Sequence, residues 1–279
     1  MKTFLIVPVV LFALTLSAKE QCVWRDEFNG TSLNSHFWTA ETNFIRNIDA
    51  VQIYTDRIEN LHLSEGALQL TSRHETFEST NCKPESPRWW ESRKTAHYTS
   101  GSVNSKGKVE FCYGRLEFRA RIEHGRGVWP ALWLVGTRPG WPACGEIDVM
   151  EYVSQNPKTI HVTCHWTMDE IYNHPTAQRH CNTIDGQWHV YGLNWTPEKI
   201  EVTFDGKLIY ILNLDDTKGL SGKSPFRDHT FYIILNQAVA GWSESPVAED
   251  YPRTFAIDYV RLYQDPRMKQ RILDVGKQQ

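Results

Sequence analysis

The stretch Gly145-Glu-Ile-Asp-Val-Met-Glu151 holds three carboxylates within six residues. Side chains alternate between the two faces of a strand, so Glu146 and Asp148 would share one face and the apolar residues between them the other. Regular alternation would then turn Glu151 away from the other acids. A β-bulge at Val149-Met150, where two residues oppose one, would bring it back. The stretch therefore predicts a bulged strand with one acidic and one apolar face.

The spacing of the outer two acids suggests a chemistry. With the bulge, the Cα atoms of Glu146 and Glu151 would lie about 13 Å apart, and each side chain reaches ~4 Å inward, which leaves ~5 Å between the carboxyl groups. That separation is typical of glycosidases that retain the anomeric configuration. A solvated strand face is the alternative. Mutual repulsion of the acids and the aromatic flank Trp129 to Trp133 favour a catalytic site.

The rest of the chain predicts strands. Short alternating runs recur between turn residues, and Asp205-Gly206 separates two of them as a hairpin turn would. Helical periodicity is confined to Met268–Val275. We therefore expect an all-β antiparallel sandwich, in which each sheet buries its apolar face against the other. The runs are Ala67–Ser72, Gly114–Ile122, Thr159–Trp166, His189–Trp195, Lys199–Phe204, Lys207–Leu212, Thr230–Leu235 and Phe255–Tyr263.

The first 18 residues have the pattern of a signal peptide. Lys2 precedes an apolar run, Phe4–Leu16, which is too short for a permanent membrane span, and Ser17-Ala18 follows. We expect a single domain at 19–279 that is secreted, periplasmic or attached to the cell surface. Lipid anchoring at Cys22 is an alternative. With no later long apolar run and a net charge of −3, we expect no membrane span and no nucleic-acid partner.

Six cysteines in an exported chain can form up to three disulfides. Cys164 and Cys181 bound a segment that resembles an insertion, and we expect this pair to be bonded. Their spacing fits no zinc motif.

The chain contains 11 tryptophans. Several lie in segments rich in glycine, proline or polar residues, where we expect loops. Each could be a core residue, but as a set near an acidic centre they suggest platforms on which sugar rings stack. They are Trp89, Trp90, Trp141, Trp166 and Trp242.

Two adjoining segments, Trp129–Leu134 and Trp141–Tyr152, resemble the catalytic core of glycoside hydrolase family 16 in its laminarinase-like branch. That branch includes endo-β-1,3-glucanases and endo-β-1,4-galactosidases of the mucin O-glycanase type. The resemblance implies a β-jelly-roll of two curved antiparallel sheets with a concave cleft, and an endo-acting, retaining enzyme that needs no cofactor for catalysis. Further matching segments are Asp26–Phe28, Tyr98–Gly101, Asn104–Gly107, Tyr113–Arg115 and Ile257–Tyr263.

The resemblance also implies roles for the acids. Glu146 would be the nucleophile and Glu151 the general acid/base, while Asp148 between them would hydrogen-bond Glu146. These roles agree with the physics, because like charges in one site push their pKa values apart.

Other positions that match the family imply a substrate-binding set. Trp129 and Trp133 would line the cleft, with Trp133 nearest the reacting sugar. His165 would orient a carboxylate or the leaving hydroxyl. His161, four residues away, would share its face, and metal ligation by the two histidines is an alternative. A structural calcium ion is implied on the convex side, held by Glu27, Gly66 and Asp258, mostly through carbonyl oxygens and with one carboxylate.

The chain departs from glucan-cleaving relatives in four segments: Asp49-Ala50, Ser102, Trp166–Tyr172 and Ala240–Trp242. These changes remove hydrogen-bond donors, including an arginine at Ser102, from the region where sugars on the non-reducing side would bind, and polar subsites discriminate sharply. They leave the acids untouched.

We therefore favour an endo-β-1,4-galactosidase acting on N-acetyllactosamine-containing chains of the mucin O-glycan or keratan type. The alternatives are an endo-β-1,3(4)-glucanase, a transglycosylase and a non-catalytic carbohydrate-binding protein. The expected partner is a β-linked oligosaccharide or polysaccharide, and we expect a monomer.

Overall fold

The computed structural model describes residues 20–42, 49–80, 82–86, 89–138, 140–227 and 229–266. The expected signal peptide at 1–18 and the expected helix at Met268–Val275 lie outside these residues, as do the side chains of Trp89 and Trp90. No helix in the described part of the chain is long and apolar enough to cross a membrane.

Strands dominate the described residues and form two sheets. The ten-stranded sheet has the order β17 (Lys207–Asn213), β16 (Lys199–Phe204), β15 (Trp188–Trp195), β9 (Gly114–Ile122), β19 (Arg253–Gln264), β5 (Ala67–Glu78), β6 (Thr95–Ser100) and β3 (Gln52–Tyr54), with β1 (Gln21–Asp26) on β19 and β4 (Leu61–Ser64) on β5. The nine-stranded sheet has the order β13 (Ile171–Asn173), β12 (Thr159–Met168), β11 (Glu146–Tyr152), β10 (Val128–Gly136), β18 (Phe231–Val239), β7 (Ser102–Asn104) and β2 (Thr39–Ala40), with β14 (Thr176–His180) on β12 and β8 (Glu110–Phe111) on β18. The described helical segments are α1 (Trp89–Ser92) and the 3-10 turns η1 (Leu214–Thr217) and η2 (Ala248–Asp250).

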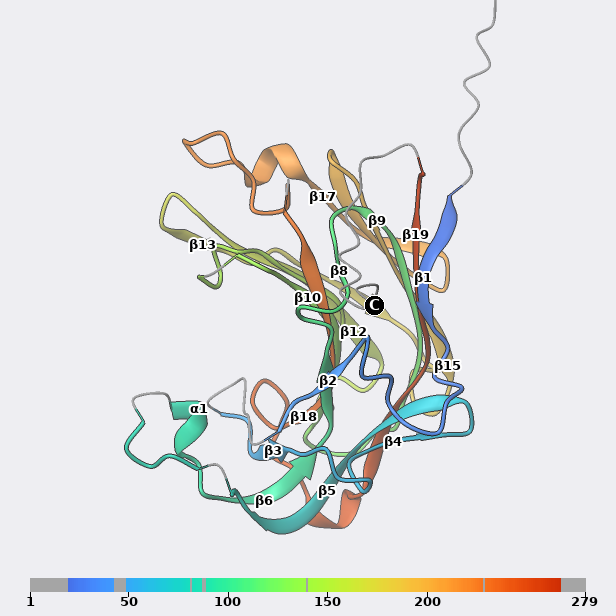
Figure 1. Cartoon of the computed structure of the whole chain (residues 1–279), viewed down its shortest axis with the longest axis vertical. Coiled ribbons are helices and arrows are strands. Elements are labelled where there is room, and N and C mark those ends of the chain that lie inside the picture. The colour runs from blue at the N-terminus through green and yellow to red at the C-terminus, as the bar shows by residue number, and fades with distance from the viewer. Residues whose placement is uncertain are drawn as a thin grey trace, which may run out of the picture.

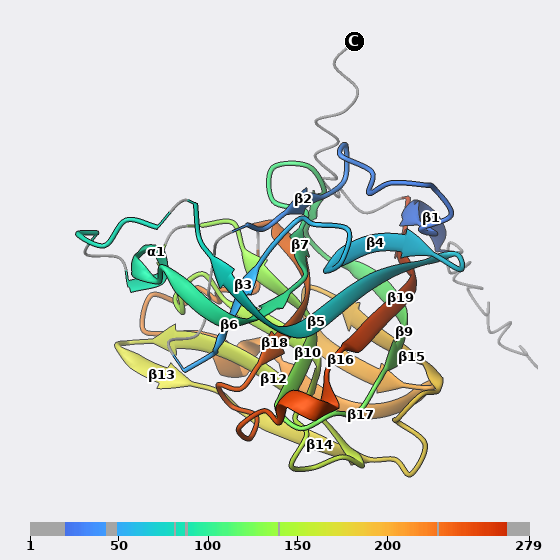
Figure 2. The same cartoon turned by 90° about the horizontal axis from the view of Figure 1, so that it is seen from below.

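The expected jelly-roll sandwich is confirmed. Figure 1 shows β10, β12 and β18 in one layer and β9, β19 and β1 in the other. Figure 2 shows the order of the nine-stranded sheet from β7 through β18 and β10 to β12 and β13. Every predicted strand is present. One pairing departs from the antiparallel expectation, since β3 and β6 run parallel.

The predicted hairpin between β16 and β17 is also present. Phe204 pairs with Lys207, so the turn has two residues. Asp205 and Gly206 both have positive φ, 48° and 72°, the conformation that a two-residue hairpin turn requires. Glycine adopts it freely, which is why this dipeptide is a strong hairpin signal.

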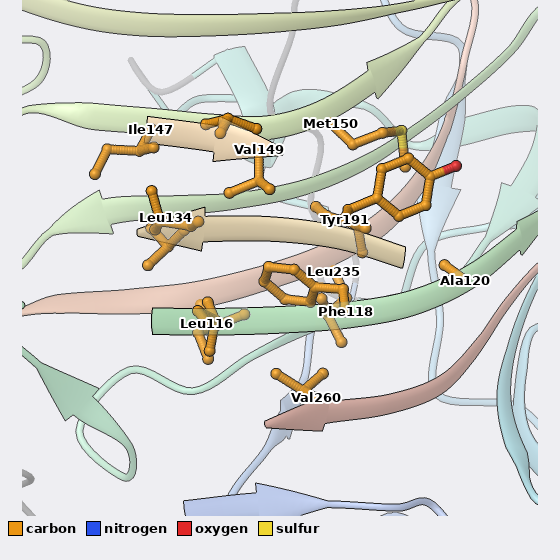
Figure 3. Packing of buried hydrophobic residues seen from close by; sticks show 14 of the residues in the cluster. Leu116, Phe118, Ala120, Leu134, Ile147, Val149, Met150, Tyr191, Leu235 and Val260 are labelled. Atoms are coloured by element: carbon orange, nitrogen blue, oxygen red, sulfur yellow. The ribbon is translucent and has the colours of Figure 1, made fainter. Parts of the chain in front are cut away.

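The core lies between the two sheets. Ile147 and Val149 from β11 face Leu116 and Phe118 from β9, and all four side chains are fully buried (Figure 3). Burying such a side chain stabilises the fold by roughly 1.5–3 kcal/mol. The apolar face of β11 therefore fixes the strand in the sandwich and turns its acids outward.

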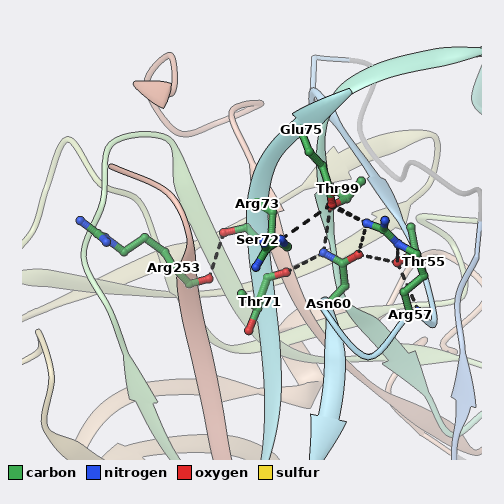
Figure 4. Close-up of polar contacts among 9 residues, drawn as sticks. All are labelled: Thr55, Arg57, Asn60, Thr71, Ser72, Arg73, Glu75, Thr99 and Arg253. Carbon is green, nitrogen blue, oxygen red and sulfur yellow. Dashed lines mark hydrogen bonds and ion pairs between the residues drawn. The ribbon is translucent and has the colours of Figure 1, made fainter. Parts of the chain in front are cut away.

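A buried polar network joins the loop before β4 to strands β5 and β6 (Figure 4). The Asn60 side-chain amide donates to the Thr71 carbonyl at 3.0 Å and to Thr99 Oγ1 at 2.9 Å. Arg57 forms an ion pair with Glu75, whose carboxylate also accepts a hydrogen bond from Thr99. Burial requires these polar groups to be paired, so the network fixes the course of this loop.

The expected Cys164–Cys181 disulfide is absent: neither of these two cysteines, both in the described part of the chain, is disulfide-bonded. The reason is the pairing of β12 with β14. The Cys164 amide bonds to Pro175, whereas the Cys181 amide bonds to Lys158. The two cysteines are thus about six residues apart along the ladder, or ~20 Å, far beyond the reach of a disulfide.

Candidate active site

The predicted bulge lies in β11. Between Asp148 and Glu151 the chain advances three residues on β11 but two on β12. Val149 and Met150 are successive residues, yet both belong to the buried core, and Figure 3 shows them among its side chains. The extra residue is absorbed on the apolar side, so the three acids share the opposite face, where the resemblance places the concave cleft.

The register also confirms the spacing assumed for the outer acids. Glu146 lies opposite His165 and Glu151 opposite His161, four residues apart on β12. At about 3.3 Å per residue this separates the two glutamate Cα atoms by ~13 Å. The ~5 Å separation of their carboxyl groups stays a prediction.

Asp148 is the most buried of the three acids, with its side chain 4% exposed. Burial, reinforced by the charge of Glu151, raises its pKa well above the ordinary value, while a hydrogen bond with Glu146 opposes the rise. Asp148 is therefore set to hold a proton and share it with Glu146, as the resemblance implied.

Glu151 has the properties of a general acid. Burial and the charge of Glu146 raise its pKa to about 7. The indole of Trp129 donates to Oε1 of Glu151 at 3.1 Å and, with His165, opposes that rise. A carboxyl group that titrates near neutrality can give and retrieve a proton at physiological pH.

Trp141 lies at the other acid. Its ring is 58% exposed, and its indole nitrogen donates to Oε2 of Glu146 at 2.7 Å. The ring is thus held in one orientation at the cleft by the carboxylate beside it, which suits the predicted role as a sugar platform.

His165 contacts the acids as predicted. Its Nε2 lies 3.0 Å from Oδ2 of Asp148 and 3.8 Å from Oε1 of Glu146. Its Nδ1 lies 2.5 Å from the hydroxyl of Tyr172, a residue that the sequence interpretation did not select. The alternation of Tyr172 and His174 around Asn173 was the available signal for an exposed strand in this segment.

Trp166 is not a sugar platform, contrary to the prediction. It lies in β12 rather than in a loop, is 4% exposed, and packs edge-on against Phe226 in the core. Strand alternation is the reason, because His165 faces the cleft and the next residue must face the other sheet.

His161 and Trp242 lie together beside Glu151. His161 is only 2% exposed, and its ring centroid is 4.7 Å from that of Trp242, which is 42% exposed. Both ring nitrogens of His161 are buried, without a hydrogen-bonding partner among the described residues. His161 therefore supports Trp242 instead of contacting sugar directly, which corrects its predicted role.

The loop that carries Trp242 is fixed to the end of β11. The Gln155 side chain donates to the Trp242 carbonyl at 2.9 Å, and the Ser154 and Ser243 hydroxyls lie 2.9 Å apart. The Trp242 and Trp129 rings meet edge to face, with centroids 6.1 Å apart. Together these contacts make Trp129, Trp242 and Glu151 one packed unit.

A polar strip continues across the same sheet towards β2. Trp133 donates from Nε1 to Asn236 Oδ1 at 2.7 Å, and Asn236 lies opposite Ser102. Ser102 is buried and donates to Glu41 Oε2 at 2.6 Å. Asn236 and Glu41 are polar groups on the concave face that the sequence interpretation did not select.

One side-chain group among the described residues could hold a metal ion: Glu146, Asp148 and His165, with one oxygen or nitrogen of each within 4.8 Å of the others. Asp148 bonds to Glu146, and His165 is in contact with both acids. We therefore assign this group to acid chemistry.

The calcium prediction stays a prediction, and two arginines compete with it. The carboxylate of Asp258, one of the three expected ligands, accepts a hydrogen bond from Arg119 at 2.5 Å. Both carboxylate oxygens of Glu27 accept bonds from Arg261 at 2.8 Å. Each carboxylate thus already has a cationic partner, so a calcium ion that took one carboxylate ligand here would have to compete with an arginine.

Comparisons with known proteins agree with this geometry. The family model for glycosyl hydrolases family 16 matches residues 41–260. A solved structure from work on endo-acting O-glycanases that the human gut microbiota uses to initiate mucin breakdown superposes with a TM-score of 0.85 at 37% identity, covering 90% of this chain and 93% of that one.

Two relatives differ in what their names say they cleave. Glucan endo-1,3-beta-glucosidase A1 of Niallia circulans is 33% identical over 87% of this chain, which spans 38% of that protein's length. Keratan-sulfate endo-1,4-beta-galactosidase of Sphingobacterium multivorum is 34% identical over 61% of this chain and 41% of its own length.

Proposed function

This chain belongs to family 16 of the glycosyl hydrolases, and from that premise we propose that it cleaves internal β-1,4-galactosidic bonds in N-acetyllactosamine-containing chains of mucin O-glycans or keratan. It is an endo-glycosidase. The proposal concerns the sugar that it selects.

In the mechanism that we propose, Glu146 attacks the anomeric carbon and Glu151 protonates the leaving oxygen. Glu151 suits the second role because its pKa of about 7 keeps it largely protonated in neutral or slightly acidic solution. Asp148 and Trp141 hold the nucleophile in place by hydrogen bonds. Glu151, having lost its proton, then activates water to hydrolyse the glycosyl-enzyme intermediate with retention.

The observation that carries the galactoside proposal is that Ser102 is buried and bonded to another side chain. Glucan-cleaving relatives usually have arginine after the Thr-Ser-Gly segment, and a guanidinium there could donate to a sugar hydroxyl. Ser102 is buried and gives its hydrogen bond to Glu41 instead. The similarity to the structure from the work on mucin O-glycanases, with a TM-score of 0.85, also supports a galactoside substrate.

Two other altered segments lie side by side near this strip. Ala50 forms an isolated β-bridge with Ala240, two residues before Trp242. The changes in both segments therefore act on one region of the cleft, as a coordinated change in the preferred sugar would require.

Parallel digestion tests the proposal. Purified enzyme would be incubated with keratan, mucin O-glycans, laminarin and barley glucan, and the products sized by mass spectrometry. We expect oligosaccharides with galactose at the new reducing end from the first two substrates. Faster cleavage of laminarin or barley glucan would overturn the galactoside proposal in favour of an endo-β-1,3(4)-glucanase. Release of monosaccharides alone would contradict endo action.

A glucanase is the second candidate, because the cleft tryptophans Trp129 and Trp133 are those that the family resemblance placed there, and the Niallia circulans relative is named as a glucanase. A non-catalytic binding protein is disfavoured by the complete acid set. The Glu146→Gln variant decides between catalysis and binding: it should abolish turnover and still bind oligosaccharide. Substantial residual hydrolysis would sink the nucleophile assignment.

We also propose that the enzyme is exported, since residues 1–18 have the pattern of a signal peptide. N-terminal sequencing of the protein recovered from the medium or periplasm tests this: a start near Lys19 is expected, and a start at Met1 would overturn it.

A further inference from the structure

The β12–β13 hairpin places two aromatic side chains against His165. In this hairpin Trp166 pairs with Asn173 and Thr167 with Tyr172. The next positions along the same register put His174 directly opposite His165, with Tyr172 diagonal to it. Alternation then directs all three side chains to the concave face.

Their contacts are close. The rings of Tyr172 and His165 are nearly parallel, with an interplanar angle of 14° and centroids 5.8 Å apart. His174 stacks on His165 at 24° and 6.1 Å. The Tyr172 hydroxyl lies 2.5 Å from His165 Nδ1. His165 is therefore held by a stack and a hydrogen bond from the hairpin, on the side opposite its contact with the acids.

The hairpin itself is fixed at its tip. Its two turn residues, Asp169 and Glu170, have positive φ values of 49° and 67°, which are unfavourable for residues other than glycine. The Asp169 carboxylate accepts a hydrogen bond from the Leu220 backbone amide, at 2.9 and 3.0 Å from its two oxygens. This bond stabilises the turn and limits where Tyr172 can lie.

The hydrogen bonds around His165 have a definite direction. Asp148 Oδ2 is buried and has no hydrogen-bonding partner among the described residues, and His165 Nε2 lies 3.0 Å from it. Asp148 shares its proton with Glu146, which leaves Oδ2 as an acceptor, and a hydrogen on His165 Nε2 would satisfy that oxygen. A neutral imidazole carries one N–H, which leaves Nδ1 as an acceptor. Tyr172 must therefore donate.

We propose that Tyr172 is a positioning residue of the active site: its hydroxyl donates to Nδ1 of His165 and fixes the tautomer whose Nε2–H donates to Asp148. Asp148 in turn bonds to Glu146, so the chain of hydrogen bonds runs from the edge strand to the nucleophile. Burial and the three nearby carboxylates raise the pKa of Tyr172, which keeps the donating proton in place. The titratable groups facing His165 are Glu146 and Asp148 on β11, Tyr172 on β13, and His174, which directly follows β13.

This inference rests on glycosidase activity at the site but not on the identity of the sugar. It can therefore be tested first without substrate. Nitrogen-15 NMR of labelled histidines at pH 8, with a His165→Asn variant to assign the signals, reports the tautomer directly. We expect Nε2–H for His165 in the native enzyme and a mixture of tautomers in Tyr172→Phe. The Nδ1–H tautomer in the native enzyme, or an unchanged tautomer in Tyr172→Phe, would overturn the proposal.

Kinetics on the best-cleaved polysaccharide then separate positioning from sugar stacking. Tyr172→Phe keeps the ring and loses only the hydroxyl, and we expect kcat to fall about fivefold with KM within twofold, the effect of one lost neutral hydrogen bond. Tyr172→Ala should lose at least as much kcat. If Tyr172→Phe has native kcat while Tyr172→Ala raises KM, the residue is a stacking platform and the proposal is wrong. Ile171→Ala, an exposed neighbour on β13, is the matched control and should be unaffected.

Discussion

Trp141 donates a hydrogen bond from its indole nitrogen to Oε2 of Glu146 at 2.7 Å, so the exposed ring at the cleft is bonded to the carboxylate that we assign as nucleophile. Two functions of one side chain can be separated by substitution. Trp141→Phe keeps an aromatic face and loses the donor, and we expect kcat to fall about five- to tenfold with little change in KM. Trp141→Ala should raise KM as well. Steady-state kinetics would refute the double role if both variants changed KM alone.

The pH dependence of activity should report Glu151. Its pKa is raised to about 7, and it must be protonated to act as a general acid, so kcat/KM should decline above about pH 7. The bond from Trp129 opposes the rise of that pKa. Trp129→Phe should therefore move the alkaline limb to higher pH. A limb that stays in place or moves to lower pH in the variant would contradict the assignment of Glu151.

The free energy of unfolding should also depend on Glu151, because the buried carboxylate that serves catalysis destabilises the fold once it is ionised. Because the pKa of Glu151 is raised from 4.5 to about 7, the folded protein binds more protons than the unfolded chain between these pH values, so the free energy of unfolding falls as pH rises through this window. Glu151→Gln cannot ionise. We expect it to match the native enzyme near pH 4.5 and to exceed it at pH 8, by on the order of 3 kcal/mol at most. Urea unfolding at both pH values checks this, and equal stabilities at pH 8 would show that burial costs Glu151 nothing.

Two tryptophans to which the sequence analysis gave the same role should behave in opposite ways. Trp166 lies in the core, and Trp166→Ala should destabilise the fold by about 3–5 kcal/mol. Trp242 is 42% exposed at the cleft, so Trp242→Ala should raise KM with a smaller change in stability. Thermal unfolding together with kinetics on both variants tests the distinction. A KM effect of Trp166→Ala in a fully folded enzyme would place that residue back in the cleft.

The acid motif was predictable because its information is local. Alternation in Gly145–Glu151 required a bulge, and the bulge lies where alternation fails, between Asp148 and Glu151. The same rule would have placed Trp166 in the core, since it follows His165 in one strand. That error came from counting Trp166, the last residue of a predicted strand, among the tryptophans of loops.

Other features depend on contacts between distant segments. Tyr172 was missed because its hairpin turn is Asp169-Glu170, which lacks the glycine that usually marks such turns. The ion pairs of Arg119 with Asp258 and Arg261 with Glu27 join residues more than a hundred positions apart. The disulfide expectation failed for the same reason, because proximity in sequence across a hairpin says nothing of the ladder that separates Cys164 from Cys181.

The order of the nine-stranded sheet has a consequence for how such an enzyme can change. β11, which carries the acids, is flanked by β10 and β12, whereas β13, which carries Tyr172, is at one edge and β2 at the other. An insertion in a central strand disrupts its hydrogen bonds with two neighbouring strands. An edge hairpin can be extended or exchanged while only one such pairing is disturbed. In this architecture evolution can replace the parts that meet the sugar's periphery while the bond-breaking centre is inherited intact.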